Sequence, residues 1–380
     1  MKQITKHLIF GLLFSAGQAL AGETRSECIG RLTFEVKEDI EWATFPASSV
    51  TRISQAGGGG HAFSENISGR SESGHYDYGS LTLYVTDIVA RSELEDAANY
   101  IRGTGRLYQK QLQDNIEIKK SRIPDLKEMG YGSDVIAEVE SEIKQLEREI
   151  PLAHVYDHDL GIDDAYILGS KDVPSEVFLW RDQRIYYFTF SEPPKDSAER
   201  IKDLVARFRP RDLYEVPEGP GVCFPYGFIA DDGKTSSEFK FSFRFTRTPN
   251  VIFSLLTVSP DNPFDVKPTV GTYDTDYRPG YDASKWKKSK IIERLYFGNR
   301  LAGLEGWRLD PKPGSGEQER AWFALAHIGG MIDPLLAVQV FTFQKGTDDL
   351  TDFTPPPEEV LPRLINLTKT MKQTLDGVDR

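Results

Sequence analysis

The stretch FKFSFRFTR, residues 239–247, alternates apolar and polar side chains without a break. Its phenylalanines stand at positions 239, 241, 243 and 245, so they share one face of an extended strand. A strand with one apolar face is typical of antiparallel sheets, because the strands of parallel sheets are buried on both faces and read as continuous apolar runs. The stretch therefore favours an antiparallel sheet and argues against the doubly wound fold of solute-binding modules.

The same succession of elements is found on both sides of this strand. YYFTF (186–190) is followed by Pro-Pro and an amphipathic helix over 197–208. QVFTF (339–343) is followed by Pro-Pro-Pro and a terminal helix within 354–375. Each half also opens on a cysteine. The halves therefore read as a duplicated unit, and the alternative is that two common strand–proline–helix endings match by chance.

Residues 91–150 have a different composition, rich in Glu, Lys, Gln, Leu and Ile. In SDVIAEVESEIKQLEREI (133–150) apolar residues recur at three- and four-residue spacing behind Ser133, a good helix N-cap. A preceding helix is expected over roughly 91–121, and the segment from Pro124 to Gly132 makes the reversal. This pattern predicts a helical hairpin inserted in the first half, with a heavily charged outer face.

These elements predict an α+β fold with two domains of mainly antiparallel sheet flanked by helices. The predicted N-terminal domain spans 22–215 and contains the helical hairpin, at about 91–150. The predicted C-terminal domain spans 216–380. Between them, RPRDLYEVPEGPG (209–221) has the proline and glycine content of a linker. At this chain length two domains are also the prior expectation.

The N-terminal residues 1–21 have the pattern of a secretory signal peptide. Two lysines precede a short apolar run at 8–16, and Ala19 and Ala21 form an A-x-A cleavage site. We expect cleavage after Ala21 and export to a bacterial periplasm; the alternative is a buried N-terminal helix. Cys28 lies beyond the cleavage site, which argues against lipidation.

The charge balance excludes some partners. The chain has 46 basic and 58 acidic residues, a formal net charge of −12. Nucleic acids and anionic lipids require a positive surface, so neither is expected as a partner, whereas a basic protein partner is permitted. No later segment has the roughly 18 uninterrupted apolar residues that a membrane-spanning helix needs.

The two cysteines, Cys28 and Cys223, open the two halves. Export permits a disulfide, and two cysteines allow one intramolecular bridge. A Cys28–Cys223 bond would join the beginnings of the two domains. Two separately buried thiols, each acting as a small apolar residue, would explain the matching positions equally well.

The sequence offers no catalytic or metal constellation. There is no G-x-S-x-G elbow, and carboxylate pairs carry no weight among 58 acids. In AHVYDHDLGIDDAY (153–166) two histidines stand four apart, which on a helix could bind a metal. Pro151 and Gly161 favour a loop instead, so we expect a solvated acidic loop or an acidic partner contact, no metal and no cofactor.

Two segments are candidate protein contacts. One is this acidic loop, and the other is YDTDYRPGYDASKW (273–286), whose Tyr, Arg and Trp are typical of interface hot spots. An ordinary exposed loop has the same composition. The candidate partner-binding residues are Asp157, Asp159, Asp163, Asp164, Tyr277, Arg278, Tyr281 and Trp286.

Four motifs together resemble a known family. They are CIGRLTFEVKEDIEWATF (28–45), GPGVCFPYGFIADDG (219–233), GLEGWRL (303–309) and ERAWFALAH (319–327). In this order they are similar to type VI secretion immunity proteins, the Tli proteins cognate to the fourth class of lipase effectors. The stretch FEVKEDIEW (34–42) departs from the family pattern, because it lacks the proline that often follows the first strand.

The resemblance implies a two-domain periplasmic protein that is not an enzyme. It would bind a toxic phospholipase and block access to the active site of that enzyme. We expect the inserted hairpin (107–150) or the loops at 153–164 and 273–286 to reach the effector, although the family's contact positions do not transfer by motif. The rival interpretation is a periplasmic hydrolase or ligand-binding protein.

Overall fold

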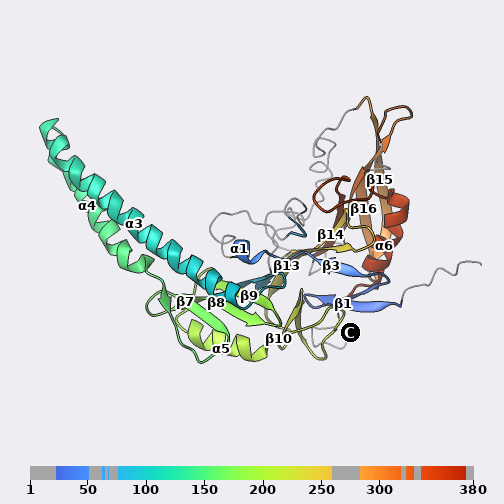
Figure 1. The fold of residues 1–380 in the computed structure, drawn as a ribbon, viewed down its shortest axis with the longest axis horizontal. Coiled ribbons are helices and arrows are strands. Elements are labelled where there is room, and N and C mark those ends of the chain that lie inside the picture. The colour runs from blue at the N-terminus through green and yellow to red at the C-terminus, as the bar shows by residue number, and fades with distance from the viewer. Residues whose placement is uncertain are drawn as a thin grey trace, which may run out of the picture.

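An antiparallel sheet runs through the body of the protein, and a long helical hairpin projects from one side of it (Figure 1). The structure is a computed structural model that describes residues 23–50, 62–64, 67, 76–258, 283–317, 322–328 and 335–373. In this part of the chain the largest sheet has thirteen strands, and there are two further sheets of three strands. The predicted α+β class with mainly antiparallel sheet is confirmed.

The first half begins with two hairpins and a short helix: β1 (Arg25–Ile29), β2 (Leu32–Val36), β3 (Ile40–Trp42), α1 (Ala47–Val50), β4 (Tyr76–Tyr78) and β5 (Leu81–Val85). The inserted helices follow: α3 (Ser92–Glu128), α4 (Ser133–Glu149) and the 3-10 turn η1 (Ile150–Ala153). The half ends with β6 (Tyr156–Asp157), β7 (Ala165–Gly169), β8 (Pro174–Arg181), β9 (Arg184–Phe190), α5 (Ser197–Arg207) and β10 (Phe208–Pro210).

The second half has a similar order. It opens with β11 (Gly221–Phe224), β12 (Gly227–Ala230), β13 (Ser237–Phe245) and β14 (Val251–Val258). It continues with β15 (Trp286–Phe297), β16 (Arg300–Pro311), β17 (Trp322–Ile328) and β18 (Leu335–Thr342), and ends with α6 (Pro357–Thr370) and β19 (Lys372–Gln373).

The strand order within the main sheet is the same in both halves. From the centre outward, the first half reads β4-β5-β9-β8-β7-β6 and the second reads β13-β14-β18-β17-β16-β15. The two central strands, β4 and β13, pair with each other in antiparallel fashion. In chain order the helical hairpin stands between β5 and β6, and residues 259–285 stand between β14 and β15. This agreement of strand order is what a duplication requires.

Each half supplies its last short strand to the opening hairpin of the other. β10, which follows α5, pairs with β12 through Phe208 and Ile229. β19, which follows α6, pairs with β2 through Lys372 and Thr33. The two halves are therefore joined by exchanged strands as well as by the central β4–β13 pair.

The alternating strand β13 lies at the middle of the core, as its phenylalanine pattern predicts. Phe243 is completely buried, and its ring centroid lies 5.4 Å from that of Trp42 and 5.3 Å from that of Phe253. Its polar face is also covered, since Ser242 is buried against Ser254 with their hydroxyl oxygens 2.5 Å apart. The apolar core cluster around Phe243 contains residues of both halves.

The segment 209–221 is packed into the body, which differs from the linker that its composition suggested. It starts in β10, and Arg211 from this segment is fully buried in an ion pair with Glu27 of β1. The Tyr214 hydroxyl accepts a hydrogen bond from the Ile40 backbone N–H at 2.8 Å. Proline and glycine shape the path of this segment, but its side chains hold it against the first half. The division into domains 22–215 and 216–380 stays a prediction.

A disulfide joins Cys28 of β1 to Cys223 of β11, and both residues are completely buried. Beside it, the Gly30 N–H donates to the Cys223 carbonyl at 2.7 Å, and the Cys223 N–H donates to the Gly30 carbonyl at 2.8 Å. The two opening hairpins therefore meet at their cysteines. We call the group of Glu27, Cys28, Gly30, Arg211 and Cys223 the hairpin junction.

The projecting arm consists of α3 and α4, which confirms the predicted helical hairpin (Figure 1). α3 continues through Pro124 to Glu128, seven residues beyond its predicted end. Pro124 lies in the last turns of α3, and it removes one backbone N–H donor there. The burial of Leu126, which follows it, favours continuation of the helix. Gly130, with a φ of 77°, then turns the chain. No described helix is both long enough and apolar enough to cross a membrane.

Candidate partner-binding surface

The base of the arm rests on the sheet of the first half. Leu94, Ala97, Ala98 and Ile101 of α3 are buried in a second apolar cluster together with Phe178 and Tyr187 of the sheet. The Phe178 and Tyr187 rings stack with their centroids 4.5 Å apart. The first turns of α3 are thus fixed by packing, while the rest of the arm extends beyond the body.

A groove of about 410 Å³ opens where α3 leaves the sheet. Its lining residues are Ile101, Thr104, Gly105, Leu107, Tyr108 and Gln111 of α3, Val155 of the segment before β6, and Glu176 of β8. The walls are therefore mainly apolar, with a single carboxylate among them.

Gly105 allows the close approach of the helix to the returning chain. A Cβ atom at this position would lie 2.7 Å from the Val155 Cγ2 and 2.9 Å from the Ala153 carbonyl oxygen. Gly103, two positions earlier and on the other side of the helix, has only the flexible end of Arg106 nearby, at 3.8 Å.

We expect Gly105→Ala to be less stable than Gly103→Ala by about 1–3 kcal/mol. Alanine stabilises the middle of a helix relative to glycine, so Gly103→Ala should exceed the wild type by about 0.5–1 kcal/mol. At Gly105 the same gain is opposed by overlap with backbone and side chain. Urea unfolding of both variants measures the difference; equal stabilities would mean that the arm does not approach Val155 as described.

Glu176 is the charged group of the groove. The Tyr187 hydroxyl donates a short hydrogen bond to its Oε2. Burial raises the pKa of the Glu176 carboxyl, and the hydrogen bonds from Tyr187 and Thr189 oppose that rise without cancelling it. The carboxylate thus has neutral donors on the protein side, and no ion pair among the described residues includes it.

The arm exposes several large apolar side chains to a third or more of their surface. On α3 and at its tip these are Tyr100, Leu107, Tyr108, Ile118, Met129 and Tyr131, and Leu152 follows in η1. Scattered apolar residues are normal on a surface, but two of these stand at the groove mouth. Leu107 is 56% exposed and Tyr108 is 48% exposed. Aromatic and aliphatic side chains in such places are typical anchors of protein interfaces.

The predicted acidic loop lies next to the base of the arm, and two of its four aspartates already have arginine partners. Asp157 pairs with Arg102 of α3, and Asp164 pairs with Arg91, whose Nε donates to its Oδ1 at 2.6 Å. The other two are exposed. Asp159 accepts the backbone N–H of Gly161 at 3.0 Å. No group of three metal-ligating side chains occurs in the part of the chain that the structure describes.

The second predicted contact segment is only partly described. Tyr277, Arg278 and Tyr281 lie outside the described residues. Trp286, the first residue of β15, is 1% exposed and packs beside Leu309. In this structure its ring belongs to the interior, so it does not offer a surface anchor.

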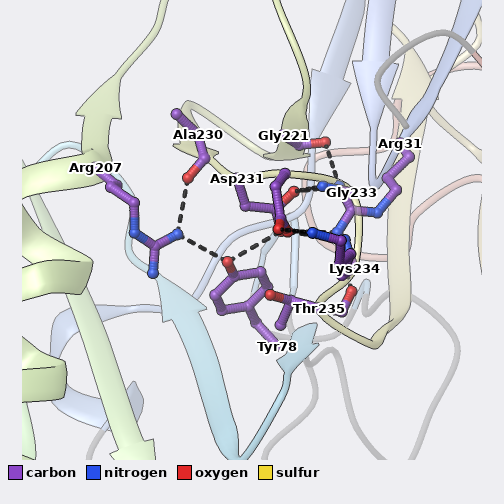
Figure 2. Close-up of polar contacts among 10 residues, drawn as sticks. Arg31, Tyr78, Arg207, Gly221, Ala230, Asp231, Gly233, Lys234 and Thr235 are labelled. Atoms are coloured by element: carbon purple, nitrogen blue, oxygen red, sulfur yellow. Dashed lines mark hydrogen bonds and ion pairs between the residues drawn. The ribbon is translucent and has the colours of Figure 1, made fainter. Parts of the chain in front are cut away.

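A buried polar network lies between the opening hairpins and α5 (Figure 2). Arg31 makes a two-bond ion pair with Asp231, at 2.6 and 2.7 Å, and also donates to the Thr235 carbonyl. The Tyr78 hydroxyl donates to Asp231 at 3.0 Å and accepts a bond from Arg207 at 2.9 Å.

The groups of this network satisfy one another. Burial by itself would raise the pKa of the Asp231 carboxyl, but the Arg31 guanidinium, the Gly233 N–H and the Tyr78 hydroxyl outweigh it and hold that pKa below its usual value. With these donors and acceptors paired to one another, the cluster joins four segments of the fold and so has a structural role.

Sequence reasoning missed the groove and Glu176. Glu176 lies in PSEVFLWR, a strand whose composition gives no sign of a binding site. A carboxylate next to the apolar run VFLW was the one available signal, and only the packing of α3 against β8 gives it meaning.

Comparison with known proteins identifies part of the second half. Residues 215–263 match the family model described as Tle cognate immunity protein 4 C-terminal domain. Over these residues the chain is similar to that domain. This match confirms the resemblance seen in the sequence motifs, and the matched residues include Cys223 and the strands β11 to β14. A search of curated proteins found no match.

Three solved structures have a similar arrangement of the chain. Two are of the immunity protein TplEi of the type VI secretion system of Pseudomonas aeruginosa. The complex with an "L" peptide has 11% identity and a TM-score of 0.48, covering 93% of this chain and 98% of that one. The apo form has 10% identity and a TM-score of 0.46, covering 93% and 97%. The Tle4–Tli4 complex has 10% identity and a TM-score of 0.45, covering 93% and 98%.

Proposed function

We propose that this protein is an immunity protein that binds and inhibits a cognate type VI secretion phospholipase effector. The observation that carries the proposal is the match of residues 215–263 to the Tle cognate immunity protein 4 C-terminal domain. An immunity protein acts by binding its effector rather than by catalysis, so the expectation of a binder and not an enzyme is confirmed by the family.

The surface of the molecule is consistent with such binding. Exposed aromatic and aliphatic side chains on the arm offer anchors for a protein interface. The net charge of −12 would accelerate association with a basic partner. By covering the mouth of the lipase active site, the bound chain would keep substrate away from it.

The compartment follows from the same assignment. Immunity proteins of this kind are periplasmic. For this chain we further propose that residues 1–21 are a signal peptide cleaved after Ala21, on the grounds of its two lysines, apolar run and A-x-A motif.

The direct test is binding and inhibition. The mature chain, 22–380, is co-expressed with the lipase encoded beside it. The lipase is made inactive by substitution of its nucleophile, and the two proteins are co-purified. Hydrolysis of phospholipid vesicles by the active lipase is then measured with increasing amounts of the chain. We expect a stable complex and loss of lipase activity at stoichiometric ratios. A lipase that neither binds nor loses activity would contradict the proposal.

We also propose that the distal arm, residues 113–148, contributes to the interface, as the predicted role of the inserted hairpin suggests. Its exposed apolar residues include Met129, 65% exposed, and Tyr131, 52% exposed. Replacing 113–148 by a short Gly-Ser turn leaves the Gln109–Ile150 hydrogen bond at the base intact. We expect lipase binding to weaken at least about tenfold.

The milder double substitution Met129→Ser/Tyr131→Ser serves as the matched variant for the distal arm, because it removes the exposed apolar groups and leaves both helices. Thermal unfolding of both variants reports whether the body remains folded. If the shortened chain is folded and inhibits as well as the wild type, the distal arm is not part of the interface.

A further inference from the structure

The groove at the base of the arm is lined by a carboxylate that has no cationic partner among the described residues. This carboxylate is Glu176, and its hydrogen bonds come from the neutral hydroxyls of Tyr187 and Thr189. A carboxylate in an apolar setting is stabilised most strongly by a directly contacting positive charge. The described chain supplies no such charge at Glu176, although it supplies arginines to the neighbouring Asp157 and Asp164.

The nearest cations of α3 are directed elsewhere. Arg102 donates to Asp157 and to Asn99, and its guanidinium lies 5.0 Å above the Tyr166 ring. The Arg106 side chain is directed toward Gly103: a Cβ atom built on that glycine would lie 3.8 Å from the Arg106 Nη2. The groove-lining positions of this helix are occupied by Ile101, Thr104, Gly105, Leu107, Tyr108 and Gln111, none of which is charged.

The walls fit an extended aliphatic stem. Of the lining residues, Ile101 is buried, while Leu107 and Tyr108 are about half exposed. Lysine and arginine side chains bury their methylene stems along apolar surface and keep the charged head at a polar group. A stem lying along these walls would have its charged head in the same groove as Glu176.

We propose that this groove receives a lysine or arginine side chain of the effector. Glu176 is its counter-charge, and Leu107 and Tyr108 contact its methylene stem. The proposal rests on the proposed function, because it names the chemistry of the partner at one place on the interface. The acidic net charge of the chain favours a basic partner segment at this place as well.

A metal ion fits the groove less well. Calcium and magnesium need several oxygen ligands, preferably carboxylates and carbonyls, and the lining side chains supply one carboxylate, two hydroxyls and one amide. A bare ion would also leave the apolar side chains of the walls without a contact. A protein side chain uses both the carboxylate and the walls.

Glu176→Gln tests the proposal, because it removes the charge and keeps an oxygen that accepts the Tyr187 hydrogen bond. Asp172→Asn is the matched control, since it removes one exposed carboxylate from the turn before the same strand, β8. Affinity for the inactive lipase is measured by calorimetry for the wild type and both variants. Thermal unfolding shows whether each variant is folded; Glu176→Gln should be at least as stable as the wild type.

We expect Glu176→Gln to weaken binding at least about tenfold and Asp172→Asn to change it less than about threefold. If the wild type binds and both variants bind within threefold of it, the groove does not receive a cation, and the proposed function still stands. If the wild type does not bind the lipase, the proposed function fails and this inference fails with it. A twofold symmetric dimer of the chain that Glu176→Gln dissociates would also overturn it, since the occupant would then be a second copy.

Discussion

Replacing both Cys28 and Cys223 by alanine is expected to lower the free energy of unfolding by about 5 kcal/mol. The bond joins residues 195 positions apart. Without it, the unfolded chain gains the conformational freedom of a very long open loop, and in the chain-entropy model this gain is the main source of the stabilisation. The folded hairpin junction keeps its two Gly30–Cys223 backbone hydrogen bonds, so the native fold should persist.

Urea unfolding of the double variant and of the wild type, with and without reductant, measures this effect. The reduced wild type should approach the stability of the variant, and reductant should not change the variant itself. Two titratable thiols in the denatured, unreduced wild type would show that the bridge is not formed in solution. Equal unfolding midpoints with and without reductant would show that the bridge is formed but contributes nothing.

Local patterns were sufficient to predict several of the longer strands and the two helices that pair into the arm. Phe239 to Phe245 alternate in the sequence and lie in the core as expected. The β8–β9 turn at Asp182 and Gln183 lies between two apolar runs, and both residues have the positive φ values of a tight hairpin. These features depend on neighbours within a few residues, which is why the sequence alone reveals them.

The exchange of closing strands could not be predicted. β10 and β19 have three and two residues, and their partners lie in the opposite half of the chain. In sequence they look like the ends of helices or the start of a linker, because such short strands carry no periodicity. The packing of 209–221 into the body was missed for the same reason, since Arg211 acquires its role only when Glu27 is placed beside it.

The candidate site was predicted in outline and missed in detail. The inserted hairpin and the loop beside it were singled out from their charge and position, and the structure places them together at the base of the arm. Glu176 was not found, because one carboxylate among 58 acids is distinguished only by what packs around it. Trp286 was chosen for its residue type, which marks buried cores as often as interfaces.

The second large effect is expected at the ion pair of the hairpin junction. Replacing Arg211 by methionine should lower the free energy of unfolding by about 3–5 kcal/mol. The Arg211 and Glu27 side chains are both 0% exposed, and Arg211 Nη2 lies 2.6 Å from Glu27 Oε1. Without the arginine, Glu27 would keep the backbone N–H donors of Cys28 and Tyr214 but would remain a buried charge with no counter-charge.

Arg209→Met is the matched control on the same segment. Arg209 also pairs with a glutamate, Glu215, at 2.6 Å, but these side chains are 44% and 41% exposed. An exposed pair contributes at most about 1 kcal/mol, so this variant should unfold near the wild type. The double variant Glu27→Gln/Arg211→Met removes both buried charges while the glutamine oxygen still accepts one backbone N–H, and it should recover part of the loss. If Arg211→Met is no less stable than Arg209→Met, the junction is held by the disulfide and its backbone hydrogen bonds, and the ion pair contributes little.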